Sequence, residues 1–335
     1  MIEAVLGAAA LLAATSAAFV WGLSRAVERR YPAVGHLVDL GPGRLHVVET
    51  PAQGRERGAV LLVHGASGNF ADPHEALAQR LAAQGFRVFA VDRPGHGYSD
   101  RLGRRRDATS PRRQAAWIRE ALAVLGAGEA IVVAHSLAGV LGLAMALEAP
   151  EFTRGLVLLA PVSHPWKGGV SWYYSVAALP VVGALFRWTL APPAGLAMMR
   201  GAVAEVFAPN PVPERYVERT RLPLVLRPSH FLANSEDFVD LHAETVELSP
   251  RYGEISAPTA VVMGAEDRLV SADIHARRLA EEIPAATLSL LPGVGHSPHF
   301  SDPDSVLAAV LAVERRAGAP RAAGEPAAAK STRSR

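Results

Sequence analysis

The residues from Ala130 to Gly139 constrain the fold more strongly than any other part of this 335-residue chain. The run from Ala130 to Ala134 is apolar and rich in β-branched residues, which predicts a strand buried on both faces. The run stops at Ser136, which has an alanine two positions before it and another, Ala138, two positions after it. Small residues at these positions let a strand turn sharply into a helix, with the serine at the apex. Glycine is commoner at both positions, so the fold has to accommodate two additional methyl groups.

The rest of the chain predicts an α/β fold with a mostly parallel central sheet and helices on both faces. A hairpin opens the pattern, and buried strands then alternate with amphipathic helices across short turns. Strands are expected at 36–40, 44–49, 59–63, 86–91, 130–134, 155–160, 259–263 and 287–291, and helices at 72–83, 110–125, 272–282 and 302–316. Open α/β sheets bind ligands at the carboxyl ends of their strands, which is where Ser136 is expected.

The N-terminal segment predicts a membrane anchor. No residue between Glu3 and Arg25 is charged, and residues 4–23 are enough for a helix across a bilayer core of ~30 Å. Arg25, Arg29 and Arg30 follow, so the positive-inside rule places the rest of the chain on the cytoplasmic side. We expect a single-pass protein of the inner (cytoplasmic) membrane. A cleaved signal with a secreted or periplasmic product, and a merely buried helix, remain alternatives.

The expected fold has five parts along the chain. From residue 162 to 256 the sheet pattern gives way to segments rich in Trp, Tyr, Pro and Met, which indicate core helices, a mobile helical lid, or both. The last residues are rich in Ala, Pro and Arg, which is typical of disorder. The expected parts are an N-terminal transmembrane helix at 1–30, a core at 31–161, a helical cap at 162–256, the second part of the core at 257–316 and a disordered tail at 317–335.

The composition limits the kinds of site that the chain can hold. It has no cysteine, which excludes disulfides, thiolate nucleophiles and Cys-ligated metals. A net charge of +2 does not indicate nucleic-acid binding. No group of His, Asp and Glu has metal-ligand spacing along the sequence, and no phosphate loop follows a strand. We therefore expect no metal, no cofactor and no nucleic-acid partner. The apolar N-terminal segment makes a membrane an expected partner, and together with the apolar segments of residues 162–256 it favours a small hydrophobic substrate. The oligomeric state is left open.

A serine at such a turn needs two further groups before it can act as a nucleophile. Its hydroxyl is a poor nucleophile at neutral pH, so a histidine has to accept its proton and an acid has to orient that histidine. Asp267 comes just after one expected strand, and His296 just after the next. Glu266 and His299 are the alternatives for the acid and for the base.

Five motifs in order resemble those of the α/β-hydrolase superfamily, over about residues 38–316. They are Val63-His64-Gly65, Asp92-Arg93-Pro94-Gly95-His96-Gly97-Tyr98-Ser99, Ala134-His135-Ser136-Leu137-Ala138-Gly139, Gly264-Ala265-Glu266-Asp267 and Gly295-His296. The resemblance implies that Ser136 is the nucleophile, that His296 is the general base and then the acid, and that Asp267 orients His296. It also implies that residues 162–256 are the cap of this superfamily.

An acyl-transfer serine also needs donors for the developing oxyanion. The backbone N–H of Leu137, after the turn, and that of Ala66, after His64 and Gly65, are the expected pair. Histidines in these motifs usually make structural hydrogen bonds, so we expect no proton transfer by His64 or His135. The residues expected to line the substrate cleft are His64, Gly65, Ser67, His135 and His299.

The resemblance implies a serine hydrolase, esterase-like or lipase-like, that cleaves an ester or thioester of a hydrophobic acyl substrate through an acyl-enzyme. Dehalogenases and epoxide hydrolases of the superfamily use a carboxylate nucleophile, which position 136 does not supply. Two alternatives remain. One is a cofactor-free C–C bond hydrolase or haloperoxidase-like enzyme with the same triad. The other is a membrane-tethered ligand-binding protein without catalytic activity.

Overall fold

A computed structural model describes residues 1–318 of the chain apart from residue 285. Its centre is an eight-stranded sheet with the strand order β1-β2-β4-β3-β5-β6-β7-β8. β2 pairs antiparallel with both β1 and β4, and all other neighbouring strands are parallel. The strands are β1 (His36–Asp39), β2 (Arg44–Thr50), β3 (Gly58–Val63), β4 (Phe86–Val91), β5 (Ala130–His135), β6 (Thr153–Leu159), β7 (Thr259–Gly264) and β8 (Ala286–Leu291).

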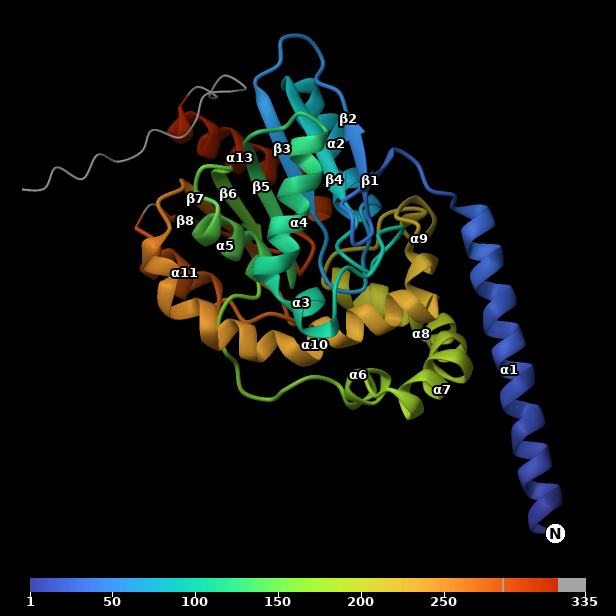
Figure 1. Ribbon diagram of the computed structural model, residues 1–335. Helices are drawn as coiled ribbons and strands as arrows, with labels where there is room; N and C mark the ends of the chain where they lie inside the picture. The colour runs from blue at the N-terminus through green and yellow to red at the C-terminus, as the bar shows by residue number, and fades with distance from the viewer. Residues whose placement is uncertain (285, 319–335) are drawn as a thin grey trace, which may run out of the picture.

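Helices cover both faces of the sheet, as the alternating pattern predicts (Figure 1). α2 (Ala71–Ala83) and α13 (Pro303–Ala317) pack on one face, and α4 (Pro111–Val124), α5 (Ala138–Glu148) and α11 (Ala276–Glu282) on the other. All six residues of β5 are buried, because this strand lies between the two apolar layers. Every expected strand is present with its ends within two residues, whereas α11 begins four residues later than expected because turns occupy positions 272–275.

The segment between β6 and β7 is helical. It contains α6 (Trp172–Ala177), α7 (Val181–Thr189), α8 (Ala191–Phe207), α9 (Tyr216–Arg219), the 3-10 helix η1 (Leu222–Leu226), α10 (Pro228–Leu248) and the 3-10 helix η2 (Ser249–Glu254). Figure 1 shows α10 crossing below the sheet, with α6 and α7 beyond it. A buried ion pair joins α10 to the core, since Asp237 lies 2.5 Å from Arg93 in the loop after β4. We call residues 162–256 the cap.

The N-terminal helix α1 (Ile2–Arg30) extends beside the cap and well beyond it (Figure 1). Among the described residues it is the one helix long and apolar enough to cross a membrane alone. α7 and α8 together form a second apolar stretch of that length, bent by 58° at the break between them. Of the predicted disordered tail, residues 319–335 lie outside the described part of the chain, and α13 ends at Ala317.

Candidate active site

Ser136 lies at the apex of a strained turn between β5 and α5. Its φ is 54°, in the left-handed region that a non-glycine residue rarely adopts. Its N–H donates to the Leu159 carbonyl at 2.9 Å, and its carbonyl accepts from the Gly139 N–H at 2.8 Å. The methyl of Ala134 fits because α5 has glycine at the facing position, where a Cβ on Gly142 would lie 3.1 Å from it. The turn therefore forms with alanine at both flanking positions.

Three side chains from three strand ends form one hydrogen-bonded chain. His296 Nε2 lies 2.9 Å from Ser136 Oγ, and His296 Nδ1 lies 2.7 Å from Asp267 Oδ2. Ser136 follows β5, Asp267 follows β7 and His296 follows β8, so the parallel sheet brings together residues 160 positions apart. This is the relation of nucleophile, base and orienting acid that activates a serine hydroxyl.

The loop after β7 fixes Asp267 as the acid of this chain. Its second oxygen, Oδ1, accepts from the N–H groups of Leu269 and Val270 at 2.8 and 3.0 Å. The carboxylate is therefore held by its own loop while Oδ2 faces His296. Glu266, the alternative acid, is exposed, and the carboxylate bonded to His296 is that of Asp267.

The loop after β3 packs closely against the turn that carries Ser136. A Cβ on Gly65 would lie 3.1 Å from the Cβ of Ser136 and 3.2 Å from the His135 carbonyl oxygen, so only glycine fits here without displacing a neighbour. Within residues 1–318, residue 285 apart, the N–H groups of Ala66 and Leu137 form no hydrogen bond. Two unbonded backbone donors beside a nucleophilic serine form the arrangement that stabilises an oxyanion.

The cap reaches the loop after β3 (residues 64–70), which we call the oxyanion loop, through α10. Asn234 Oδ1 accepts from the Ser67 N–H at 2.7 Å, and its Nδ2 donates to Ser67 Oγ at 3.2 Å. Tyr174 of α6 stacks on Phe238 of α10, with ring centroids 4.4 Å apart. Burial, together with Tyr173 beside it, raises the pKa of the Tyr174 phenol, and the nearby polar groups of Ser67 and Asn234 oppose this rise. Ser67 therefore lies under the cap as part of a polar group that the sequence pattern did not reveal.

The cap also holds the loop that carries His296. Asn210, just after α8, donates through Nδ2 to the Gly293 carbonyl at 2.8 Å and accepts at Oδ1 from the Gly295 N–H at 2.9 Å. A Cβ on Gly295 would lie 2.2 Å from the Ala208 carbonyl oxygen. The backbone of the cap and the histidine loop therefore touch directly, and Asn210 bridges them.

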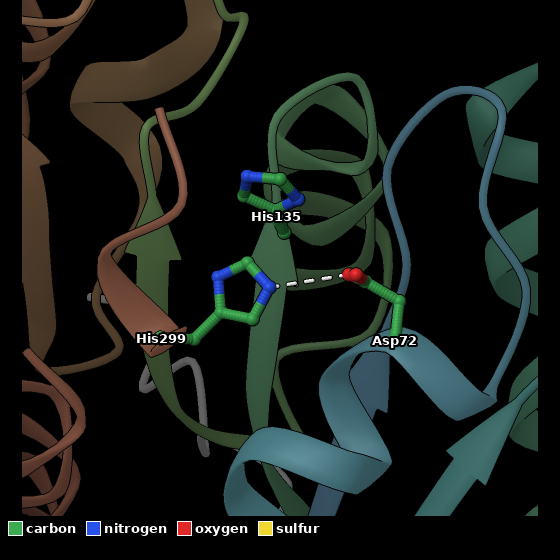
Figure 2. A group of neighbouring side chains, drawn as sticks. All are labelled: Asp72, His135 and His299. Atoms are coloured by element: carbon green, nitrogen blue, oxygen red, sulfur yellow. Dashed lines mark hydrogen bonds and ion pairs between the residues drawn. The ribbon is translucent and has the colours of Figure 1, made fainter. Parts of the chain in front are cut away.

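A second group of buried side chains consists of Asp72 from α2, His135 from the end of β5 and His299 from α12 (Pro298–Ser301) (Figure 2). His299 Nε2 lies 3.1 Å from Asp72 Oδ2, and the Tyr216 hydroxyl donates to Asp72 Oδ1 at 2.7 Å. Burial raises the pKa of Asp72, but the charge and hydrogen bond of His299 outweigh it and hold the pKa at about 2. His135 Nε2 donates to the His296 carbonyl at 3.0 Å. The group thus supports the backbone of His296.

The same three residues have ligand-type atoms within 4.8 Å of one another, although they are far apart in sequence. Sequence spacing could not reveal this group, because its members come from three different elements. Both oxygens of Asp72 already accept hydrogen bonds, so we assign the group a supporting role.

The residues expected to line the cleft therefore occupy two kinds of position. Gly65 lies beside the turn that carries Ser136, and Ser67 lies under the cap, where it bonds Asn234. His64 is fully buried, with Nδ1 2.8 Å from the Gly65 carbonyl and Nε2 accepting from the Arg93 N–H at 3.1 Å. Burial and the Arg93 charge lower the pKa of His64 to about 4. The structure gives His64, His135 and His299 supporting positions behind the site.

Comparison with known proteins agrees with this fold. The model of the family described as "Alpha/beta hydrolase family" matches residues 60–310. A 2-hydroxy-6-oxononadienedioate/2-hydroxy-6-oxononatrienedioate hydrolase from Comamonas testosteroni is 28% identical over 256 residues, which cover 74% of this chain and 84% of that protein. A 2-hydroxy-6-oxo-6-phenylhexa-2,4-dienoate hydrolase from Burkholderia cepacia is 27% identical over 258 residues, with the same coverage.

A solved structure shares the fold. The 2-hydroxy-6-oxo-6-phenylhexa-2,4-dienoate hydrolase from Rhodococcus sp. strain RHA1 superposes with a TM-score of 0.65 and 20% identity. The match covers 82% of this chain and 96% of that protein.

Proposed function

Because the chain belongs to the alpha/beta hydrolase family, we propose that it is a serine hydrolase that cleaves an ester or thioester of a hydrophobic acyl substrate. The observation that supports this proposal is the chain of hydrogen bonds from Ser136 through His296 to Asp267. A triad of this kind attacks a carbonyl carbon and forms an acyl-enzyme.

Each group then has a defined part in the reaction. His296 Nε2 takes the proton of Ser136 Oγ as this oxygen attacks the carbonyl carbon, and Asp267 stabilises the imidazolium that forms. The N–H groups of Ala66 and Leu137 receive the oxyanion of the tetrahedral intermediate. His296 then gives its proton to the leaving oxygen or sulfur, and a water molecule releases the acyl group by the same steps.

The charges between cap and core favour a substrate without carboxylates. Arg93 and Arg101 bind Asp237, and Arg227 lies 3.4 Å from Glu28. These buried or half-buried arginines are paired within the chain. A dicarboxylate would need free cationic groups to replace its lost hydration. A neutral, hydrophobic ester needs none.

A second candidate is hydrolysis of a C–C bond next to a carbonyl, and one observation favours it. The two relatives described above, 27–28% identical to this chain, are named as hydrolases of 2-hydroxy-6-oxo dienoates or trienoates. These compounds contain no ester, so their hydrolysis has to break a C–C bond next to the ketone. The same triad and oxyanion donors can serve this reaction, because it also proceeds through a carbonyl carbon.

A comparison of kcat/KM between the two substrate classes tests the proposal. The full chain in detergent is given p-nitrophenyl esters from acetate to palmitate, matched acyl thioesters and 2-hydroxy-6-oxo-6-phenylhexa-2,4-dienoate, with Ser136→Ala as the control. We expect kcat/KM to be at least 100-fold higher for a medium- or long-chain ester than for the dienoate. A higher kcat/KM for the dienoate would replace the ester proposal by C–C hydrolysis. Much faster turnover of acetate than of long-chain esters would contradict the hydrophobic acyl substrate.

A further inference from the structure

Helices α6 to α8 of the cap carry an exposed apolar surface. Between Lys167 and Arg200 the sequence contains one charged residue, Arg187, whose side chain is buried and donates to the Ala177 carbonyl. Val181 is 81% exposed. The other large apolar residues exposed on this surface, which we call the cap face, are Trp172, Leu179, Val182, Leu185, Trp188, Leu190, Leu196 and Met198. An exposed apolar patch of this kind marks a contact surface rather than an ordinary solvated face.

The cap face continues directly into α1. α1 packs against α7, Ser16 Oγ of α1 donates to the Thr189 carbonyl at 2.6 Å, and Val20 is fully buried. Much of the rest of α1 is exposed, including Phe19 and Trp21. The two surfaces therefore lie side by side.

The contacts of α1 change from apolar to charged toward its C-terminal end. Glu28 lies 3.4 Å from Arg227, and Arg30 lies 2.7 Å from Glu218. Ion pairs of this kind belong in water or among lipid headgroups, since a charge in hydrocarbon is costly. These ion pairs therefore mark the position along α1 beyond which the hydrocarbon core of a bilayer cannot extend.

Helix geometry then fixes the depth of the cap face. The helix rises 1.5 Å per residue, so Ser16 lies about 10 Å below Leu23, the last residue of the apolar run. Half of a hydrocarbon core is about 15 Å. If α1 spans the bilayer, its contact with Thr189 lies inside the hydrocarbon, and α7 lies there with it.

We propose that the cap face is embedded in the same membrane leaflet as the C-terminal half of α1, so that the lipid hydrocarbon covers it. The anchor and the cap then form one membrane-bound surface, with the sheet held in the water beside it. The bent apolar pair α7 and α8 enters one leaflet and does not cross the bilayer. A consequence, which rests on the proposed function, is that an acyl substrate reaches the cap from the lipid.

The absence of cysteine in the natural sequence allows a direct test. Single variants Val181→Cys and Leu185→Cys of the full chain are labelled with a nitroxide and reconstituted in phosphatidylcholine nanodiscs. Val124→Cys is the matched control, because Val124 is an exposed valine at the end of α4 in the core. The collision rates of each label with oxygen, which concentrates in lipid, and with a water-soluble nickel chelate are measured.

We expect both cap labels to collide with oxygen at least fivefold more often, relative to the nickel chelate, than the Val124 label does. Cap labels as accessible to nickel as the control would overturn the proposal, because the cap face would lie in water. Cap labels shielded from both reagents would also overturn it, because a protein surface would then cover the face. The readout needs no turnover, so its outcome is separate from that of the ester assay.

Discussion

At the scale of single residues, the site depends on very close packing around Ser136. The φ of 54° places Ser136 in a strained conformation. The hydrogen bond from the Ser136 N–H to the Leu159 carbonyl and the close packing of Gly65 hold it there. Gly65 brings its loop within reach of both Ser136 and His135. The donors of Ala66 and Leu137 can converge on one oxyanion because this approach is so close.

The first prediction concerns Gly65→Ala. The new methyl would lie 3.1 Å from Ser136 Cβ and 3.1 Å from His135 Nδ1, so the oxyanion loop has to move by a few tenths of an ångström. A displacement at reacting groups lowers kcat strongly, and we expect a fall of about 10- to 100-fold. Gly253→Ala is the control, because its nearest neighbour would be 3.7 Å away. Unchanged kcat in Gly65→Ala would contradict this description of the donors.

The order of Ser136, Asp267 and His296, each just after a strand with a clear apolar pattern, predicted together with the superfamily resemblance the three residues that the structure joins by hydrogen bonds. Their catalytic roles stay a prediction. The oxyanion donors are backbone groups, so sequence could indicate only their positions. Sequence could not separate cleft residues from supporting ones. His64 and His299 are buried by segments distant in the chain, and no local pattern encodes those contacts.

At the scale of elements, the cap and the catalytic loops hold one another. α10 contacts the oxyanion loop through Asn234, and the end of α8 contacts the histidine loop through Asn210. Neither asparagine could be predicted, since the segment has no regular apolar period and its polar residues find partners only in the folded chain. The strands, by contrast, were predictable, because the central ones carry apolar runs, as in β3, β5 and β7, and the first two flank a turn signal.

The second prediction concerns Asn210→Ala. Two hydrogen bonds to the loop of His296 are lost, each worth about 1 kcal/mol, and the histidine becomes less well positioned. We expect kcat to fall about tenfold while KM for a short soluble ester stays within twofold. Asn210→Asp keeps the acceptor for Gly295 and is expected to recover part of the loss. A change confined to thermal stability, with kcat intact, would show that Asn210 only joins cap and core.

At the scale of the whole molecule, buried neutral histidines tie stability to pH. Burial, the largest cause in each case, lowers the pKa of several buried histidines of core and cap: to about 4 for His64 and His275, and well below the ordinary value for His96, His135 and His230. The unfolded chain protonates these residues as pH falls through about 6.5, but the folded chain does not. Stability is therefore complete above pH 6.5 and is lost as pH falls below it.

The third prediction is a steep acid destabilisation. Each buried histidine removes up to about 1.4 kcal/mol of unfolding free energy per pH unit between pH 6.5 and its folded pKa. Urea unfolding of the full chain in detergent, from pH 7.5 to 5, measures this slope. His230→Asn, which keeps an acceptor for the Gly97 N–H, is expected to reduce the slope by about one such increment. A free energy of unfolding that does not change over this range would contradict the neutral state of these residues.

We propose that Ser136 is a nucleophile activated by His296 and Asp267. The most direct measurement is labelling of the full chain with a fluorophosphonate, followed by mass spectrometry of the modified peptide. We predict stoichiometric modification at Ser136, no modification in Ser136→Ala, and labelling slowed at least 100-fold in His296→Gln, with all variants folded by circular dichroism. Labelling at another serine, or labelling of Ser136→Ala at the wild-type rate, would contradict the assignment.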